Sequence, residues 1–539
     1  MATINLPDVI LSPGLGTNKT FYIDAHTIAL IDPYASKPAS LTSATRGMSV
    51  VQAIALLLTM SPGESVAVHT RLLPHRTIIT YARNTTSTPV HDRHADQLMR
   101  YLANAGQLNG GNGLRDMETR YRVYTHILGM VARACQRKVL NRMRKLKDAM
   151  VNAIITASKY NDGPALPADG EWQDAHYATI FSLDKLTNIQ FNDFETILRE
   201  KTGHKPDDPT WCVASWLTGF AGHMLVFDVN KVPKKRETDA SDCNGKEQSG
   251  KAQESNREKE YFQDMYDLIS ACATVVKAKH AEVAVEDREV FRRMCKVAEY
   301  AVAMGKVLEA VAGRKTEYVV REVCSPDNIH GWFPKDAHCM LSYYCDSIGV
   351  RKCTADQLYE AFRHPNNFPS DQKPYGMFNQ ISFCVHPELT LAVHLAAQNQ
   401  QLPNGKANMR IGISKRSCWF CEHWLMALGE LLDIIILVSC GYSGKKVAGW
   451  RTPLPVEGVR GMEDFLEMVD MKLFRKTSMK VRALLGHVWG EVDRARIGEQ
   501  RKVKKVERSP LKGLPQGMAV VLEDANDALV KWIDQNSEQ

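Results

Sequence analysis

The sequence predicts an α+β protein with more than one domain. We expect a mainly α-helical amino-terminal region, followed by a carboxy-terminal α/β domain with three layers and a largely parallel sheet. Length indicates several domains, because 539 residues exceed what one hydrophobic core normally serves. Composition indicates folded domains, since 44% of the residues are apolar and 24% are charged. The apolar pattern is helical before about residue 316 and mixed after it, which separates the two regions.

The first 233 residues divide into two parts. Residues 1–45 are rich in Pro, Ser, Thr and Gly, so we expect a segment that wraps the surface or stays flexible. Residues 46–233 are expected to be helical. Apolar residues recur every three or four positions from Tyr124 to Ala157, which predicts one long helix with one buried face. The other face carries basic residues that could contact phosphate, although we interpret them as solvent-facing: Arg133, Arg137, Lys138, Arg142, Arg144, Lys145 and Lys147.

A charged segment interrupts the helical pattern. Residues 234–260 contain no Val, Ile, Leu, Met or aromatic residue. Such a segment cannot bury enough apolar surface to offset the entropy lost on ordering, so we expect a disordered linker. The helical pattern resumes over residues 261–316, for example at Tyr261, Met265 and Leu268.

The pattern changes after Gly313, and residues 317–497 are expected to form the α/β domain. Short runs rich in β-branched residues predict four strands: Tyr318–Val323, Ile381–Val385, Met409–Ile413 and Ile434–Ser439. The segments between the last three are long enough for helices, which favours a parallel sheet covered by helices. Met462–Ile497 is expected to be helical, and residues 498–539 to form a basic tail and a small terminal helix.

Two strand-to-helix steps of this domain carry residues that can bind a metal. The first reads His386-Pro-Glu388, with the proline suited to the first helical position. The second places Cys418 and Cys421 on one face of a helical turn, with Ser417 as the expected N-cap. Two adjacent parallel strands would bring both helix starts to the same edge of the sheet. His386 and the two cysteines could then hold one zinc ion with a fourth position left for water. Glu388 could exchange protons with that water.

This pair of motifs, H-x-E followed some tens of residues later by C-x-x-C, resembles the cytidine deaminase-like superfamily of nucleoside, nucleotide and nucleic-acid deaminases. The segments VHPEL and ISKRSCWFC resemble in particular a little-studied deaminase-like branch common in fungal proteins. The resemblance implies that His386, Cys418 and Cys421 are Zn²⁺ ligands. It also implies that Glu388 moves protons while a cytosine- or adenine-type base in a nucleoside, nucleotide or nucleic acid loses ammonia by hydrolysis. One departure is Ser417, which stands where the superfamily usually has proline.

Two alternatives stay open from the sequence. A deaminase-like domain could be catalytically inactive and serve as a zinc-binding scaffold or a regulatory interaction protein. A closed, structural zinc site could instead join Cys418 and Cys421 with other ligands. The candidates for these ligands are His423, Cys353, His364, Cys384 and His394.

Two further features bear on the substrate. Tyr442 and Trp450 could stack on a base at the mouth of the site, although an aromatic ring that seals the domain edge is the commoner role. Residues 471–512 contain thirteen Lys or Arg and four Asp or Glu, a balance of +9. This segment could bind a nucleic-acid backbone, act as a nuclear-import signal or form a solvated helix and tail. The sequence identifies no protein partner for the helical region.

Composition also excludes some classes of protein. No apolar stretch approaches the roughly 18–20 residues of a membrane helix, so no membrane span is expected. The amino terminus lacks the features of a signal peptide, and the 13 cysteines lack the regular spacing of a disulfide scaffold. We therefore expect an intracellular protein, cytoplasmic or nuclear. Its net charge of +7 is compatible with a nucleic-acid partner without requiring one.

Overall fold

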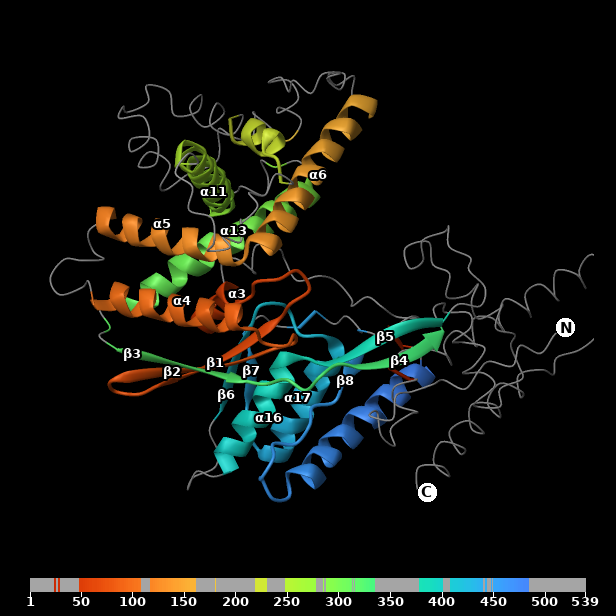
Figure 1. Cartoon of the computed structure of the whole chain (residues 1–539). Helices are drawn as coiled ribbons and strands as arrows, with labels where there is room; N and C mark the ends of the chain where they lie inside the picture. The colour runs from red at the N-terminus through yellow and green to blue at the C-terminus, as the bar shows by residue number, and fades with distance from the viewer. Residues whose placement is uncertain are drawn as a thin grey trace, which may run out of the picture. The chain divides into compact units, whose positions relative to one another are not determined.

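The computed structural model describes nine stretches of the chain and a few single positions (Figure 1). The stretches are 48–107, 117–160, 219–229, 248–277, 287–312, 316–334, 378–400, 408–439 and 449–483. The chain divides into two compact units, Met1–Met340 with Lys373–Val481 and Leu341–Gln372 with Arg482–Gln539. Nearly all described residues belong to the first unit. The predictions for residues 498–539 and for most of residues 1–45 lie outside the described residues.

A five-stranded mixed sheet forms the middle layer of this unit. Its order is β3 (Glu317–Val323), β2 (Arg76–Arg83), β1 (Val66–Leu72), β6 (Met409–Ile413) and β7 (Ile436–Val438). The pairs β2–β3 and β6–β7 are parallel, whereas β1 is antiparallel to both β2 and β6. The expected largely parallel sheet is therefore mixed. Only three residues connect β1 and β2, a loop length that permits antiparallel pairing alone.

The strands β1 and β2 correct the prediction that residues 46–233 are helical throughout. They lie next to each other in the interior of the sheet, and β1 joins the amino-terminal hairpin to β6. The run Thr77-Ile-Ile-Thr80 has the β-branched composition that indicates a strand, so the signal was present in the sequence. Of the four strands predicted after residue 316, all are found, with β5 (Phe378–Val385) longer and β7 shorter than expected.

Helices cover both faces of this sheet, so the unit has the expected three layers (Figure 1). On one face, α3 (Val50–Leu57) packs against β1 and β6, and α13 (Arg288–Val311) packs against α3. On the other face, α16 (Pro387–Gln400) packs against β1, β2 and β6. Gly412 is required where α3 crosses β6, because a Cβ there would lie 2.3 Å from the carbonyl carbon of Val51.

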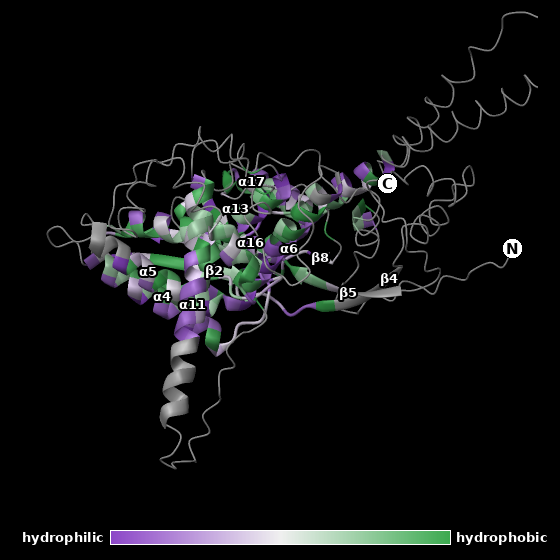
Figure 2. Ribbon diagram, turned by 90° about the horizontal axis from the view of Figure 1, so that it is seen from above, coloured by the Kyte–Doolittle hydropathy of each residue, from purple (hydrophilic) through white to green (hydrophobic). Residues whose placement is uncertain are grey.

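The helical region does not fold around a core of its own. One continuous cluster of buried side chains runs from Val66, Val68 and Ile79 in the sheet into the helices. It includes residues of α3 and α13 and of α4 (Pro89–Gln107), α5 (Met117–Ala134), α6 (Gln136–Tyr160) and α11 (Gln248–Lys277). Figure 2 shows hydrophobic residues gathered around α13, α16 and α17 and many hydrophilic residues on α11. The helices and the sheet therefore share one core.

Two helix predictions need correction. The single helix expected from Tyr124 to Ala157 is broken at Cys135, which separates α5 from α6. Its buried face is confirmed from Ile127 to Ile154, but Lys138 on the expected solvent face is only 6% exposed. Helix α11 begins at Gln248, within the segment 234–260 for which we expect disorder. Residues 248–260 are rich in Lys, Glu and Gln, so they can extend a helix that is anchored by apolar residues from Tyr261 onward.

A smaller sheet and two further helices complete the described structure. Strand β5 pairs with β4 (Ile329–Pro334) in antiparallel and with β8 (Trp450–Arg451) in parallel orientation. Helix α17 (Trp419–Leu432) follows β6 directly, and the expected helix after residue 462 is described over 462–483. Among the described residues, no helix combines the length and apolar character needed to cross a bilayer.

Candidate metal centre

The first half of the site lies at the step from β5 to α16. Strand β5 ends at Val385, His386 follows, and α16 begins at Pro387. The carbonyl of His386 accepts the backbone N–H of Leu389 at 2.9 Å, which closes the first turn. Proline suits this position because its missing N–H has no partner in a first helical turn. The step therefore fixes the backbone on both sides of the imidazole.

The second half lies at the step from β6 to α17. Cys418, rather than the expected Ser417, is the N-cap of α17, and its Sγ accepts the backbone N–H of Cys421 at 3.5 Å. Sulfur accepts hydrogen bonds weakly when neutral and better as a thiolate. The helix N-terminus favours the thiolate as well, because its unpaired N–H groups carry partial positive charge.

The route by which the two halves meet differs from the expected one. The prediction used adjacency of the strands before His386 and Cys418, but β5 belongs to the smaller sheet and β6 to the larger one. The helices provide the link instead. Helix α16 packs on β1, β2 and β6, helix α17 leaves the end of β6, and the two helices contact each other.

His386, Cys418 and Cys421 converge as predicted, and their donor atoms lie within 4.8 Å of one another. The Nδ1 of His386 is 3.1 Å from the Sγ of Cys421 and 3.6 Å from the Sγ of Cys418. The two sulfurs are 3.5 Å apart. A tetrahedral zinc ion with ordinary bond lengths separates such donors by roughly 3.5–3.8 Å. The cluster therefore fits a zinc ion with only small adjustments.

The charges at these residues favour binding of a cation. Burial alone would raise the pKa of Cys418, but a hydrogen bond with Cys421 and the charge of His386 outweigh it and lower the pKa to about 5. Burial opposes the charged form of His386, yet the negative Cys418 and a hydrogen bond with Cys384 raise the pKa of His386 well above its usual value. Burial and the neighbouring Cys418 raise the pKa of Cys421. One thiolate is thus already available to a cation.

Glu388 lies beside this cluster without joining it. Its side chain is buried, and its Oε1 is 4.0 Å from the Nδ1 of His386. The hydroxyl of Ser417 donates to the same Oε1 at 2.9 Å. The carboxylate is therefore held next to the candidate metal ligands as a separate group. That is the arrangement a proton carrier requires.

Trp450 has a different position from the one suggested by base stacking. Its ring is 1% exposed and lies 5.6 Å from the ring of Phe420, so it presents no free face to a substrate. Its indole N–H donates to the Sγ of Cys421 at 3.2 Å. The position of the ring follows from the pairing of β8 with β5, in which Trp450 lies opposite Cys384. Trp450 therefore contacts a candidate ligand, and its buried ring offers no open face for base stacking.

Tyr442, the other aromatic candidate, is half-buried and pairs with Ser417 through an isolated parallel bridge. Burial raises the pKa of its phenol, so the ring is neutral at ordinary pH. Its place beside Ser417 keeps it close to the candidate centre, and its role toward a substrate stays a prediction.

The competing structural zinc site receives no support from the described residues. His423 is on α17 but is not part of any described group of close metal-ligating side chains, and neither are Cys384 and His394. The ring of His423 instead packs edge-on against Trp419 at 4.2 Å. Cys353 and His364 lie outside the described residues.

Sequence reasoning missed three contacts of the site. The Ser417 hydroxyl donates to Glu388, and the Trp450 N–H donates to Cys421. The backbone N–H and the hydroxyl of Ser443 both donate to the carbonyl of Ser417. Only Ser417 had a signal, because it replaces a proline. The contacts of Ser443 and Trp450 depend on where these two residues, which follow β7 in the sequence, lie in the fold. The local sequence pattern does not specify those positions.

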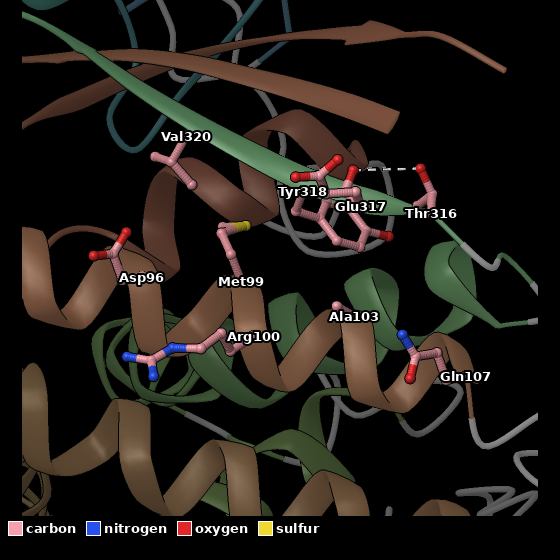
Figure 3. Close-up of a pocket in the computed structure, with 9 residues that line it drawn as sticks. All are labelled: Asp96, Met99, Arg100, Ala103, Gln107, Thr316, Glu317, Tyr318 and Val320. Carbon is pink, nitrogen blue, oxygen red and sulfur yellow. Dashed lines mark hydrogen bonds between the residues drawn. The ribbon is translucent and has the colours of Figure 1, made fainter. Parts of the chain in front are cut away.

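A separate cavity of about 560 Å³ lies between α4 and β3 (Figure 3). Its lining mixes charged, polar and apolar side chains and includes no residue of the metal cluster. The lining residues are Asp96, Met99, Arg100, Ala103, Gln107, Thr316, Glu317, Tyr318 and Val320.

Comparison with known families agrees with this geometry. Residues 385–454 match the model of a family described as OTT_1508-like deaminase. The match begins one residue before His386 and includes both cysteines and Trp450. No curated protein matches the chain, and no solved structure does.

Proposed function

We propose that the chain is a zinc-dependent hydrolytic deaminase of the cytidine deaminase-like superfamily, because residues 385–454 match the model of a deaminase-like family. Its substrate would be a nucleobase of cytosine or adenine type, in a nucleoside, nucleotide or nucleic acid. The observation that carries the proposal is the cluster of His386, Cys418 and Cys421 with the buried carboxylate of Glu388 alongside. Three ligands leave one zinc position open, which is typical of catalytic rather than structural sites.

Each residue has a distinct task in this reaction. His386, Cys418 and Cys421 would hold Zn²⁺, which lowers the pKa of water and so supplies a nucleophile near neutral pH. Glu388 accepts the proton that the water loses as its oxygen bonds to the ring carbon. The same carboxyl group then returns the proton to the exocyclic nitrogen as the C–N bond breaks. The hydroxyl left on the ring carbon gives its proton to the adjacent ring nitrogen, so the products are ammonia and a base with a carbonyl in place of the amino group.

Glu388→Gln tests this assignment. The amide is nearly the same size as the carboxylate and cannot carry the proton, so we expect kcat to fall by about 10²–10⁴-fold with zinc content unchanged. Ammonia release would be measured with cytidine, adenosine, their monophosphates, single-stranded DNA and single-stranded RNA. Glu430→Gln is the matched control, because Glu430 is exposed and pairs with Lys472. Full turnover by Glu388→Gln would reject the mechanism.

The same screen separates the enzyme from an inactive zinc-binding scaffold. A scaffold would bind zinc stoichiometrically and release no ammonia from any substrate in the panel. Ionic strength then distinguishes polymeric from free substrates. If residues 471–512 bind a phosphate backbone, KM should rise steeply with salt for single strands and barely change for nucleosides.

A further inference from the structure

Ser417 and Glu388 form a buried pair of side chains next to the metal cluster. The Ser417 hydroxyl donates to the Oε1 of Glu388 at 2.9 Å, and both residues are buried, Ser417 completely. The two residues lie on different elements, since Glu388 is in the first turn of α16 and Ser417 precedes α17. A hydroxyl that donates to a buried carboxylate makes a charge-assisted bond, stronger than one between neutral groups.

The backbone of Ser417 is held in place independently of this bond. Its carbonyl accepts the backbone N–H of Ser443 at 2.7 Å and the Ser443 hydroxyl at 2.9 Å. Ser417 also pairs with Tyr442 as a parallel bridge. The hydroxyl is therefore presented from a fixed backbone, whereas a glutamate side chain has three rotatable bonds of its own. The rigid partner can determine where the flexible one lies.

A helix-capping role does not account for Ser417. The N-cap of α17 is Cys418, whose Sγ accepts the N–H of Cys421. The hydroxyl of Ser417 makes its described hydrogen bond to Glu388 alone. Among the described residues, no hydrogen bond reaches the Oε2 of Glu388. The described role of the Ser417 hydroxyl is thus to hold the Oε1 of Glu388, the carboxylate oxygen that lies 4.0 Å from the Nδ1 of His386.

We propose that Ser417 is the positioning residue of Glu388: its hydroxyl anchors Oε1 and so holds the proton-carrying carboxylate beside the candidate metal ligands. This inference rests on the proposed function and adds a residue to it. A proton carrier works only within hydrogen-bond reach of its substrate, and a displacement of about 1 Å can reduce the rate about 100-fold. Ser417 acts through Glu388 and touches neither metal nor substrate in this role.

Ser417→Ala is the primary test. We expect kcat to fall by about 10- to 100-fold, because the anchored oxygen loses its donor while the rest of the site is unchanged. KM and zinc stoichiometry should stay within about twofold of the wild type, since neither depends on proton transfer. Ser417→Thr keeps the hydroxyl and should recover at least half of the lost kcat. Wild-type kcat in Ser417→Ala, loss of its zinc, or no recovery in Ser417→Thr would each overturn the proposal.

Ser414→Ala is the matched control for damage to the segment. The Ser414 hydroxyl accepts the backbone N–H of Val66 at 2.9 Å, so its loss weakens the same loop without touching Glu388. This variant should unfold at a lower temperature and keep the wild-type kcat. If it loses kcat as Ser417→Ala does, the effect belongs to the loop and not to the hydroxyl, and the proposal fails.

Crystal structures separate this inference from the proposed function. If the wild type deaminates none of the substrates, the proposed function has failed. Zinc-loaded crystals of the wild type and of Ser417→Ala then still report on positioning. The carboxylate of Glu388 should contact Ser417 in the wild type and move or lose order in Ser417→Ala. A carboxylate that stays in the same place in both would contradict the role of Ser417.

Discussion

The indole of Trp450 shows how a single residue can tune the candidate metal centre without binding the metal. Its N–H donates to the Sγ of Cys421, one of the three expected ligands. A donor of this kind stabilises the thiolate and fixes its direction, and loss of such a partner typically reduces metal affinity by about 10- to 100-fold. Trp450→Phe keeps an aromatic ring of smaller size and removes the donor. We expect zinc affinity to fall by that factor, measured by competition with a chelator.

Trp424→Phe provides the matched control for that substitution. Trp424 is also fully buried, and its N–H donates to the Oδ1 of Asp470 at 2.7 Å rather than to a thiol. The two variants lose the same group from similar surroundings. Trp424→Phe should therefore be destabilised and still bind zinc as the wild type does. Equal zinc affinities in both variants would show that the contact with Cys421 has no influence on the metal.

Lys138 is a buried lysine whose Nζ has no hydrogen-bond partner in the part of the chain that the structure describes. Burial, together with the charges of Arg142 and Lys415, lowers the pKa of Lys138 to about 7. In the unfolded chain the pKa of this lysine is about 10.4. The cost of burying its charge therefore lowers the unfolding free energy in full below pH 7. This cost shrinks as the pH rises toward 10. Lys138→Met removes the charge and keeps the chain length. We expect a gain in unfolding free energy on the order of a few kcal/mol at pH 6.

Urea unfolding of both proteins between pH 6 and 10 measures this effect. The stability difference between Lys138→Met and the wild type should be largest near pH 6 and shrink across the window from about 7 to 10. Taking the difference cancels other groups that titrate in the same range. A difference that is independent of pH would mean that Lys138 carries no unfavourable charge in the folded protein.

At the scale of elements, the crossing of α3 over β6 depends on one glycine. A Cβ at Gly412 would lie 2.3 Å from the carbonyl carbon of Val51 and 2.5 Å from the amide nitrogen of Gln52, both backbone atoms that cannot rotate away. Gly412→Ala should therefore force the helix and the strand apart. Overpacking of this kind typically lowers the unfolding free energy by about 1–3 kcal/mol.

Gly305→Ala is the opposite case in the same protein. Gly305 lies within α13, and a Cβ there would meet nothing within 4 Å. Alanine favours the helix over glycine by about 0.8–1.0 kcal/mol, so this variant should be slightly more stable than the wild type. Thermal unfolding of both variants checks the sign. If Gly412→Ala were as stable as Gly305→Ala, α3 and β6 would not be in close contact.

The elements also show what a single sequence can and cannot predict. The strands before His386 and Cys418 were predictable. Each contains β-branched residues, and each is followed by residues that typically begin a helix, such as Pro387 and Ser417. The break at Cys135 was not, because the apolar spacing of α5 continues into α6 and neither Gly nor Pro stands at the break. The pairing of β1 with β6 was equally inaccessible, since nearly 350 residues separate Val66 from the Ser414 hydroxyl that accepts its N–H. Motifs therefore identified the ligands, and long-range pairing determined how they meet.

At the scale of the whole molecule, the candidate centre depends on residues far upstream of the deaminase-like match. The pairs Ala67–Ile413 and Val68–Gly412 join β1 to the last residues of β6. The Lys415 side chain also donates to the carbonyl of Gly63. These contacts hold the segment that leads directly to Cys418.

A fragment that begins at residue 317, the boundary expected from the sequence, should therefore not fold. It would lack β1 and β2 from the interior of the sheet and α3 from its face, which leaves the buried sides of β6 and α16 exposed to water. We expect an aggregated product without cooperative thermal unfolding and without stoichiometric zinc. Coexpression with residues 1–316 should restore both, because that piece supplies the hairpin and the helices of the shared core.

A soluble fragment 317–539 with one bound zinc ion and a sharp unfolding transition would mean that the amino-terminal hairpin is dispensable. The deaminase-like domain would then be independent of the helical region.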